Sequence, residues 1–403
     1  MLTQPQVLCL LLLLCLLCLF VAIIRRVSET RRLMIVAGEP SGDAHAAALV
    51  KALNQKAQIE YFGATGPLMR AEGVETVVNS DELAIMGILE VAQVFPKFIA
   101  AFRALKTAAI ERAPDAVVLV DWPEFNLRLA RSLHRRGLKV IYYISPQLWA
   151  WRPRRINRIN RDVDLLLSIL PFEAEWYKAR GVDHVEFVGH PLAGEVKPRI
   201  GRNEFCKQHN LDPEKPIVSF LPGSRRKELE RILPPMAAAI RKLKDARPEI
   251  QPVIVVAPSR TIDETREILS SMNSITMVHG QTRDALAASD AAAIASGTAT
   301  LEGALLETPM VVVYKESAVN WHTLGRLITV PHYGLVNLVA GTEIATELMQ
   351  TDLTPDRLVQ ELIQLLDPKR NRTARFELRR VKDLLGEAGA SDRAADFVLK
   401  FLA

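Results

Sequence analysis

The sequence is poor in cysteine, and no cysteine is placed to build a covalent framework. Only four are present: Cys9, Cys15 and Cys18 lie in one apolar run, and Cys206 stands alone. Cys15 and Cys18 have the spacing of half a zinc site, but no second Cys or His pair completes it. The pattern therefore excludes a disulfide scaffold and favours a reducing compartment.

A strong charge imbalance and nucleic-acid-binding signatures are lacking as well. The formal net charge of +5 favours anionic partners such as phosphates, nucleotides or acidic lipid headgroups. No RNA- or DNA-binding module is evident, and the basic residues are not interleaved with stacking aromatics, so we expect no nucleic-acid partner. The 49% apolar content is typical of a folded protein, and 403 residues predict two domains.

An uninterrupted apolar run occupies residues 7–24, at the short end of what spans a bilayer. The residues before it are uncharged, and Arg25, Arg26, Arg31 and Arg32 follow it, the reverse of a secretory signal. The positive-inside bias predicts an apolar helix that anchors the chain in a membrane, with its N-terminus outside and the main body on the cytoplasmic face. A cleaved signal, or a start codon chosen too far upstream, remains an alternative.

From residue 33 onward, short apolar segments alternate with longer helical ones. The segments lack in-and-out alternation, as expected for strands covered by helices on both faces. Two such series predict an α/β fold with two Rossmann-like, doubly wound domains facing a cleft. The predicted strands are residues 33–38, 60–64, 116–122, 139–145, 164–170 and 185–189, then 217–221, 252–257, 275–278, 291–295 and 309–314.

The domain boundaries follow from this pattern. We expect an apolar N-terminal segment over residues 1–32, a first domain over 33–193 and a second domain over 194–375. A helical tail over residues 376–403 is expected to pack back onto the first domain.

Two loops of the first domain follow predicted strands, where open α/β sheets bind ligands. The first has the sequence GEPSGD, residues 38–43, in which Ser41 or Asp43 is suited to cap the next helix. The second has the sequence DWPEFN, residues 121–126, in which an acidic side chain is suited to accept a proton from an attacking hydroxyl. A purely structural turn, and a helix cap by Asp121, are the alternatives.

Two further segments of the first half stand out. The segment SPQLWAWR, residues 145–152, has paired tryptophans suited to stack on a sugar, grip an acyl chain or fill a core. Beyond it, Arg154, Arg158 and Arg161 share one face of a predicted helix. This basic face either binds an anionic lipid or a phosphorylated acceptor, or is simply exposed to solvent. Residues 83–105 hold more large apolar side chains than one packed helix face needs. Burial in the domain accounts for most of them, and the excess is compatible with an acyl-binding groove or a membrane-dipping patch.

The second domain carries two candidate anion sites. The strand 217–221 leads into PGSRRKE, residues 222–228, where Arg225 offers a charge-assisted fork to a diphosphate. The strand 291–295 leads into SGTATLE, residues 296–302, a glycine turn before a helix start with free N–H groups and hydroxyls. Glu302 is placed to reach a ribose hydroxyl. Each motif alone is also compatible with an ordinary helix cap.

Taken together, these motifs resemble those of lipid-A-disaccharide synthases. The resemblance covers residues 33–385 and rests on AGEPSGD (37–43), SPQLWAWR, PGSR and SGTATLE, with NLVAG (337–341) and the nearby Glu347, Leu348 and Gln350. Two positions depart from the family pattern: Glu124 replaces a frequent aspartate, and Val336 precedes Asn337 where proline is usual. The apolar N-terminus is not part of that pattern.

The resemblance implies the GT-B glycosyltransferase fold and transfer from UDP-2,3-diacylglucosamine to 2,3-diacylglucosamine 1-phosphate, at a membrane surface and without a metal or cofactor. It assigns Asp121 and Arg225 to catalysis. The implied UDP-binding residues are Gly223, Ser224, Arg225, Ser296, Gly297, Thr298, Thr300, Glu302, Asn337 and Gln350. The implied acceptor-domain residues are Glu39, Ser41, Gly42, Asp43, Gln147 and Trp149.

Two other functions fit parts of the pattern. Another UDP-sugar enzyme of the same fold, a 2-epimerase or a peptidoglycan lipid-intermediate transferase, needs no groove for an acylated acceptor, so the apolar segment 83–105 argues against it. An inactive, membrane-tethered UDP-sugar-binding protein is disfavoured because Asp121, Arg225 and Glu302 are all present. UDP binding without turnover would favour it.

Overall fold

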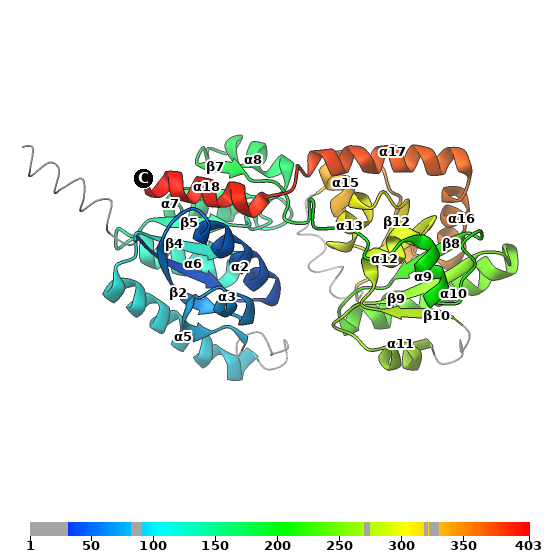
Figure 1. Ribbon diagram of the computed structural model, residues 1–403, viewed down its shortest axis with the longest axis horizontal. Helices are drawn as coiled ribbons and strands as arrows, with labels where there is room; N and C mark the ends of the chain where they lie inside the picture. The colour runs from blue at the N-terminus through cyan, green and yellow to red at the C-terminus, as the bar shows by residue number, and fades with distance from the viewer. Residues whose placement is uncertain (1–30, 82–90, 270–274, 318–320, 322–329) are drawn as a thin grey trace, which may run out of the picture. The chain divides into compact units, whose positions relative to one another are not determined.

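The computed structural model describes residues 31–81, 91–269, 275–317, 321 and 330–403, which form two compact units (Figure 1). Among them, the first unit contains residues 31–143, 161–165 and 394–403, and the second contains residues 144–160 and 166–393. The predicted apolar helix lies outside the described residues. In the described part of the chain, no helix is long and apolar enough to cross a membrane.

The first sheet has seven strands in the order β3-β2-β1-β4-β5-β6-β7, paired in parallel. The strands are β1 (Arg31–Ala37), β2 (Ile59–Thr65), β3 (Glu75–Asn79), β4 (Ala116–Val120), β5 (Val140–Tyr143), β6 (Leu165–Ser168) and β7 (Val185–Phe187). Every residue of β4 is buried, which explains its unbroken apolar sequence. The order reverses between β1 and β4, so the loops after these two strands open at the switch point where such sheets bind ligands.

The helices that follow these strands begin at proline in most cases, which suits the first helical turn because that position has no intrahelical N–H bond to lose. They are α2 (Pro40–Asn54), α3 (Pro67–Ala71), α5 (Val91–Arg112), α6 (Pro123–His134), the 3₁₀ turn η2 (Pro153–Arg155), α7 (Ile156–Asp162) and α8 (Pro171–Lys178).

The second sheet has six parallel strands in the order β10-β9-β8-β11-β12-β13. They are β8 (Ile217–Leu221), β9 (Gln251–Val256), β10 (Thr276–His279), β11 (Ala291–Ala295), β12 (Met310–Tyr314) and β13 (Glu347–Met349). Along β8, Ile217 and Leu221 join one apolar cluster while Val218 and Phe220 join another, so both faces of the sheet are buried. The switch point of this sheet lies between β8 and β11.

The second set of helices covers both faces of that sheet. Helices α10 and α16 contribute to one apolar cluster, and α12, α13 and α17 contribute to the other. The elements are α9 (Arg202–Gln208), α10 (Arg226–Ala246), α11 (Ile262–Leu269), α12 (Thr282–Ala288), α13 (Ala299–Leu305), α15 (Leu335–Ala340), η4 (Gln350–Asp352), α16 (Pro355–Leu365), α17 (Pro368–Leu384) and α18 (Ala390–Leu402).

Most of the last helix returns to the first unit, as the tail was expected to do. Residues 394–402 of α18, together with Ala403 after it, group with that unit. Lys56, just after α2, forms an ion pair of 2.5 Å with Asp396, and the Lys139 ammonium lies 5.3 Å from the centre of the Phe401 ring.

Each predicted strand is present within a few residues, and two strands were missed. Both are edge strands: β3 is half-exposed and polar, and β13 has only three residues. Neither presents the unbroken apolar run by which buried strands are recognised.

Candidate active site

The second unit contains a cavity of about 340 Å³ at the carboxyl ends of β8 and β11. The turn after each strand lines it, with Gly223, Ser224 and Arg225 on one side and Ser296, Gly297, Thr298 and Glu302 on the other. The structure thus brings the two predicted anion-binding motifs to one cavity at the switch point of their sheet.

The turn after β8 is shaped around Glu228. Gly223 has a φ of 113°, and a Cβ added there would lie 2.6 Å from Oε2 of Glu228. This oxygen accepts the backbone N–H groups of Ser224 (3.1 Å) and Arg225 (3.2 Å). The Arg225 side chain remains 84% exposed, with one nitrogen 3.3 Å from the other carboxylate oxygen. A guanidinium held in this way at a cavity is suited to bind a diphosphate through paired N–H groups.

In the turn after β11, two side-chain hydroxyls donate hydrogen bonds to backbone carbonyls and so fix the shape of the turn. Ser296 Oγ donates to the carbonyl of Tyr333 (2.8 Å), and Thr300 Oγ1 donates to the carbonyl of Gly297 (2.8 Å). The Glu302 carboxylate lies 3.1 Å from Nε of Arg283, a residue that the sequence did not single out. A sugar hydroxyl at Glu302 would therefore share the carboxylate with this arginine.

Asn337 and Gln350 hold the backbone near β13, and neither lines this cavity. Asn337 is fully buried: its Nδ2 donates to the Ala345 carbonyl and to Glu347, both at 2.8 Å, and its Oδ1 accepts two backbone N–H groups. Gln350 Oε1 accepts the N–H of Glu316 at 3.3 Å. Asn337 thus has an evident structural role, and its predicted contact with UDP remains a prediction.

In the first unit, Asp121 follows β4 in a strained turn. Asp121 and Trp122 have φ values of 48° and 50°, a left-handed conformation that costs most residues roughly 1–2 kcal/mol each. Asn126 Nδ2 (2.9 Å) and the Tyr142 hydroxyl (2.6 Å) both donate to the Asp121 carbonyl and hold the turn. The N-cap of α6 is Trp122, so the alternative that Asp121 caps this helix is wrong.

The environment of the Asp121 carboxyl favours a proton acceptor. Burial raises its pKa, the negative charge of Glu39 raises it further, and the hydrogen bond from the Trp122 backbone N–H lowers it. A carboxylate whose pKa is raised is a better base than one in water, and proton transfer is most efficient when that pKa approaches the working pH.

The GEPSGD loop follows β1, the neighbour of β4. Glu39 and Ser41 are exposed, and Gly42 and Asp43 are buried. The expectation that Ser41 or Asp43 caps the next helix is wrong, because the N-cap of α2 is Glu39 and no side chain bonds there. Asp43 instead accepts the backbone N–H groups of Gly66, Leu68 and Met69 at the start of α3, at 2.9–3.1 Å.

The SPQLWAWR segment divides into buried and exposed parts. Trp149 is buried, and its Nε1 donates to Oε1 of Glu173 at 2.9 Å, so this tryptophan fills a core. Gln147 is exposed. Burial raises the pKa of Glu173 to about 7, while hydrogen bonds from Trp149 and Leu170 oppose the shift. The sequence offered no signal for this acid, because nothing in a helix start such as PFEAE shows that its glutamate is buried.

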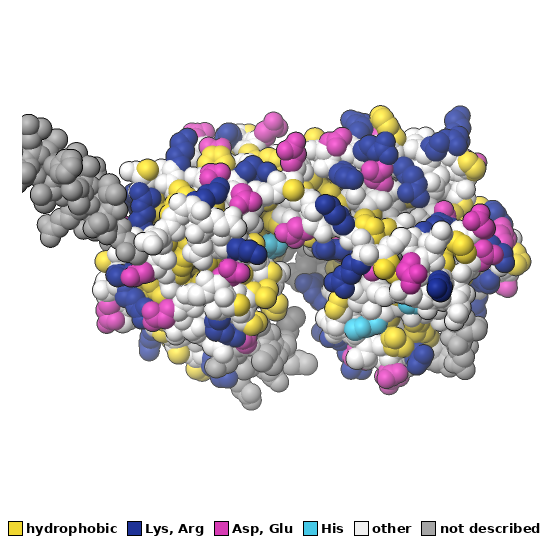
Figure 2. Space-filling view, viewed as in Figure 1, with side chains coloured by type: hydrophobic (Ala, Val, Ile, Leu, Met, Phe, Trp, Pro, Cys, Tyr) yellow, Lys and Arg dark blue, Asp and Glu magenta, His cyan; other side chains and the backbone are white. Residues whose placement is uncertain are grey.

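The predicted basic helix face is exposed in part. Arg158 is exposed on α7, Arg154 lies in η2, and Arg161 forms a bidentate pair with the buried Asp162. Arg152 and Arg155 stack on the ring of the exposed Trp151, at 4.2 and 5.9 Å. Figure 2 shows lysine and arginine interspersed with acidic side chains over the visible face, which indicates no single dominant basic surface there.

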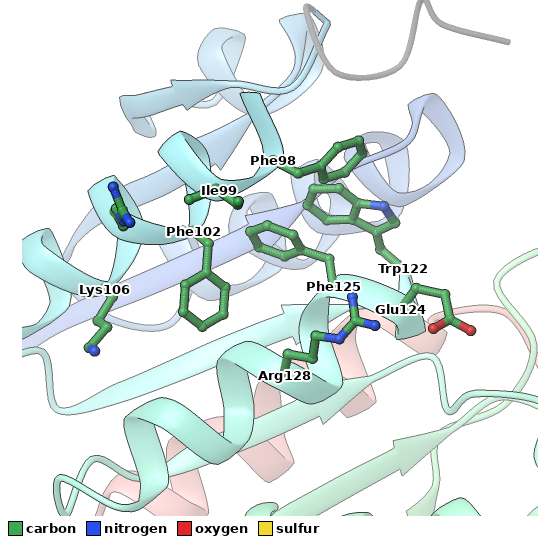
Figure 3. Close-up of a pocket in the computed structure, with 9 residues that line it drawn as sticks. Phe98, Ile99, Phe102, Lys106, Trp122, Glu124, Phe125 and Arg128 are labelled. Carbon is green, nitrogen blue, oxygen red and sulfur yellow. The ribbon is translucent and has the colours of Figure 1, made fainter. Parts of the chain in front are cut away.

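A second cavity, of about 690 Å³, lies between α5 and α6 of the first unit. Four of its nine lining residues are aromatic, and Figure 3 shows the rings of Phe98, Phe102, Trp122 and Phe125 gathered between these helices. The remaining lining residues are Ile99, Arg103, Lys106, Glu124 and Arg128. Four of the lining residues, Phe98, Ile99, Phe102 and Arg103, come from the predicted apolar segment 83–105, whose residues 83–90 lie outside the described part of the chain. We call this space the α5–α6 cavity.

A family model and individual relatives of this chain point to the same protein family. The family described as "Lipid-A-disaccharide synthetase" matches residues 33–401. The lipid-A-disaccharide synthase of Geobacter sulfurreducens is 41% identical over 378 residues, covering 93% of this chain and 98% of that protein. That of Solibacter usitatus is 42% identical over 369 residues, covering 90% and 96%. The chain belongs to the lipid-A-disaccharide synthetase family.

Solved structures of a glycosyltransferase and of a UDP-GlcNAc 2-epimerase share the fold of this chain. The calicheamicin glycosyltransferase CalG4 has a TM-score of 0.60 at 16% identity, covering 93% of this chain and 98% of that one. The UDP-GlcNAc 2-epimerase of Neisseria meningitidis has a TM-score of 0.56 at 10% identity, covering 93% and 99%. At these identities the likeness shows the GT-B type of fold alone.

Membership in the synthetase family confirms the function expected from the sequence motifs. The chain is an enzyme, a glycosyltransferase of lipid A biosynthesis. The family match, residues 33–401, includes the whole range 33–385 over which the motifs resemble the family.

Proposed function

We propose that the enzyme moves 2,3-diacylglucosamine from UDP to 2,3-diacylglucosamine 1-phosphate, forming the lipid A disaccharide 1-phosphate and UDP. The observation that carries this proposal is the cavity at the ends of β8 and β11. It joins an exposed arginine to a helix start that follows a glycine turn, two features suited to bind a sugar diphosphate.

In this proposal the second unit binds the donor. Arg225 neutralises the charge that develops on the departing diphosphate, and the start of α13 contributes its backbone N–H groups. Such groups need little reorganisation during reaction, because the Glu228 and Ser296 hydrogen bonds already hold both turns. Asn337 and Gln350 support the donor site from the region of β13.

Asp121 acts as the general base. The acceptor hydroxyl oxygen forms a bond to the anomeric carbon of the donor while the bond from that carbon to the diphosphate oxygen breaks. The proton of the hydroxyl moves to Asp121, the bonding electrons leave with UDP, and the configuration at the anomeric carbon inverts. The raised pKa of Asp121 supports this role.

The α5–α6 cavity takes an acyl chain of the acceptor. Aromatic and aliphatic side chains dominate its lining, and Arg103, Lys106 and Arg128 supply positive charge around it for the acceptor phosphate. An apolar cavity with basic residues around it suits an acceptor that carries both an acyl chain and a phosphate, and a water-soluble acceptor would not need it.

The proposed division of labour follows the family resemblance. Residues 33–193 bind the acceptor and residues 194–375 bind the UDP-sugar. We also propose that the enzyme works at the cytoplasmic face of the inner membrane, with Trp151 and its stacked arginines meeting anionic headgroups.

The test is a reconstituted transfer reaction. The purified full chain is incubated with UDP-2,3-diacylglucosamine and 2,3-diacylglucosamine 1-phosphate, and the products are identified by mass spectrometry. We expect one UDP for each disaccharide 1-phosphate. Consumption of the donor without an acceptor, or epimerisation of the donor sugar, would contradict the proposal.

A further inference from the structure

Trp122 takes part in three features of the first unit at once. It lines the α5–α6 cavity, it is the second residue of the strained turn that carries Asp121, and it contacts the loop after β1. Its contact with that loop is close, since a Cβ added to Gly38 would lie 2.1–2.5 Å from three atoms of the indole ring. Only glycine at residue 38 leaves room for the ring.

The indole is held by rings that also line the cavity. It stacks on Phe125 with ring centres 4.1 Å apart and an interplanar angle of 10°, and the Phe98 ring lies 5.7 Å away. Figure 3 shows these three rings side by side, so an apolar molecule that fills the cavity meets the ring cluster to which Trp122 belongs. Filling the space adds dispersion contacts to the side chains that line it.

The backbone of the turn is anchored from the other side. Asn126 and Tyr142 donate to the Asp121 carbonyl, which fixes the peptide on its polar side. Asp121 and Trp122 are both left-handed, and such conformations persist only where their surroundings over-determine them. The packing of the indole is therefore one of the constraints that keep the Asp121 carboxylate in place.

We infer that Trp122 is a positioning residue through which an acyl chain in the α5–α6 cavity orients the Asp121 carboxylate for proton transfer. The inference rests on the proposed function and deepens it: the acyl chain contributes to turnover as well as to binding. The indole also lies against Gly38, in the loop that brings the charge of Glu39 near Asp121.

The test compares acceptors that differ only in acyl length, 2,3-diacetyl- and 2,3-didodecanoyl-glucosamine 1-phosphate, with kcat and KM determined separately. For the unaltered enzyme we expect kcat to be about 10- to 100-fold higher with the long-chain acceptor, the range expected when a catalytic group is misplaced by around 1 Å. In W122A this advantage in kcat should disappear, with kcat falling to the level of the acetyl acceptor. W122F, which keeps an aromatic ring, should restore part of it.

The matched control is F102A. Phe102 lines the same cavity but is not part of the Asp121 turn. This variant should mainly raise KM for the long-chain acceptor and retain most of the kcat advantage. Ile110 is an exposed residue of the same helix, α5, and Ile110→Ala controls for effects of expression and purification that are common to all variants. Thermal unfolding is followed for all of them, and if W122A does not fold, W122F and W122L are compared in its place.

The outcomes separate the inference from the proposed function. The inference is wrong, and the proposed transfer stands, if the unaltered enzyme uses both acceptors with equal kcat. The same holds if W122A changes KM alone, or if it lowers kcat equally with both acceptors. If the unaltered enzyme transfers to neither acceptor, the proposed function itself fails.

Discussion

Replacing Asp121 by asparagine separates the chemistry of the carboxylate from the shape of its turn. The backbone at Asp121 is left-handed, and asparagine is among the few residues that adopt this conformation readily. The bonds that hold the turn arrive at the backbone carbonyl from Asn126 and Tyr142, so the substitution keeps them. We expect the free energy of unfolding of D121N to stay within about 0.5 kcal/mol of the unaltered value.

Turnover should respond very differently from stability. Removal of a general base lowers kcat by about 100- to 10,000-fold, which corresponds to roughly 3–5 kcal/mol in the activation barrier. The unaltered enzyme should lose activity as the pH falls and Asp121 takes up a proton. Because burial and Glu39 raise its pKa, this loss should begin above the ordinary value of 3.8. The residual activity of D121N should lack this acidic limb.

The assay measures initial rates of disaccharide formation over a range of pH at saturating donor and acceptor, with thermal unfolding recorded for the same samples. Near-normal turnover in a folded D121N, or an acidic limb that persists in it, would refute the assignment of Asp121 as the base. A large loss of stability would refute the argument about the turn.

Three further substitutions test the local structure. Asp43→Ala removes the acceptor of three backbone N–H bonds at α3 and should lower the free energy of unfolding by about 3 kcal/mol, measured by denaturant unfolding. Gly223→Ala forces a methyl group onto Glu228 and should weaken UDP binding about tenfold in titration calorimetry, whereas Gly201→Ala, where a Cβ meets nothing within 4 Å, should not. Glu173 holds its proton in the folded state up to a pKa of about 7, while the unfolded chain loses it above 4.5. The contribution of Glu173 to the free energy of unfolding should therefore be fully present below pH 4.5 and decline by up to about 3 kcal/mol as the pH rises to 7. In E173Q the urea concentration at the midpoint of unfolding should not show this decline between pH 4.5 and 7.

Much of the fold was predictable from the sequence because parallel strands buried on both faces are written as unbroken apolar runs. The loops after β1, β4, β8 and β11 were also found, since chemistry at a switch point needs glycine and polar residues at a strand end. The edge strands β3 and β13 lack that apolar signature, and both were missed.

The contacts between distant segments were not predictable in the same way. Nothing in the sequence pairs Asp43 with the start of α3, Trp149 with Glu173, or Glu302 with Arg283, because these partners are brought together only by packing. The left-handed turn at Asp121 was hidden as well, since neither of its residues is glycine. A site can thus be located from strand-end motifs, while the supporting side chains require the structure.

The most direct test of the account is a calorimetric titration of UDP into three forms of the full chain: unaltered, R225A and D121N. If the second unit alone binds the nucleotide, R225A should bind UDP at least tenfold more weakly, which is about 1.4 kcal/mol, and D121N should bind it as the unaltered chain does. Equal affinity in R225A, or a comparable loss in D121N, would contradict the assignment of the cavity between the β8 and β11 turns as the donor site.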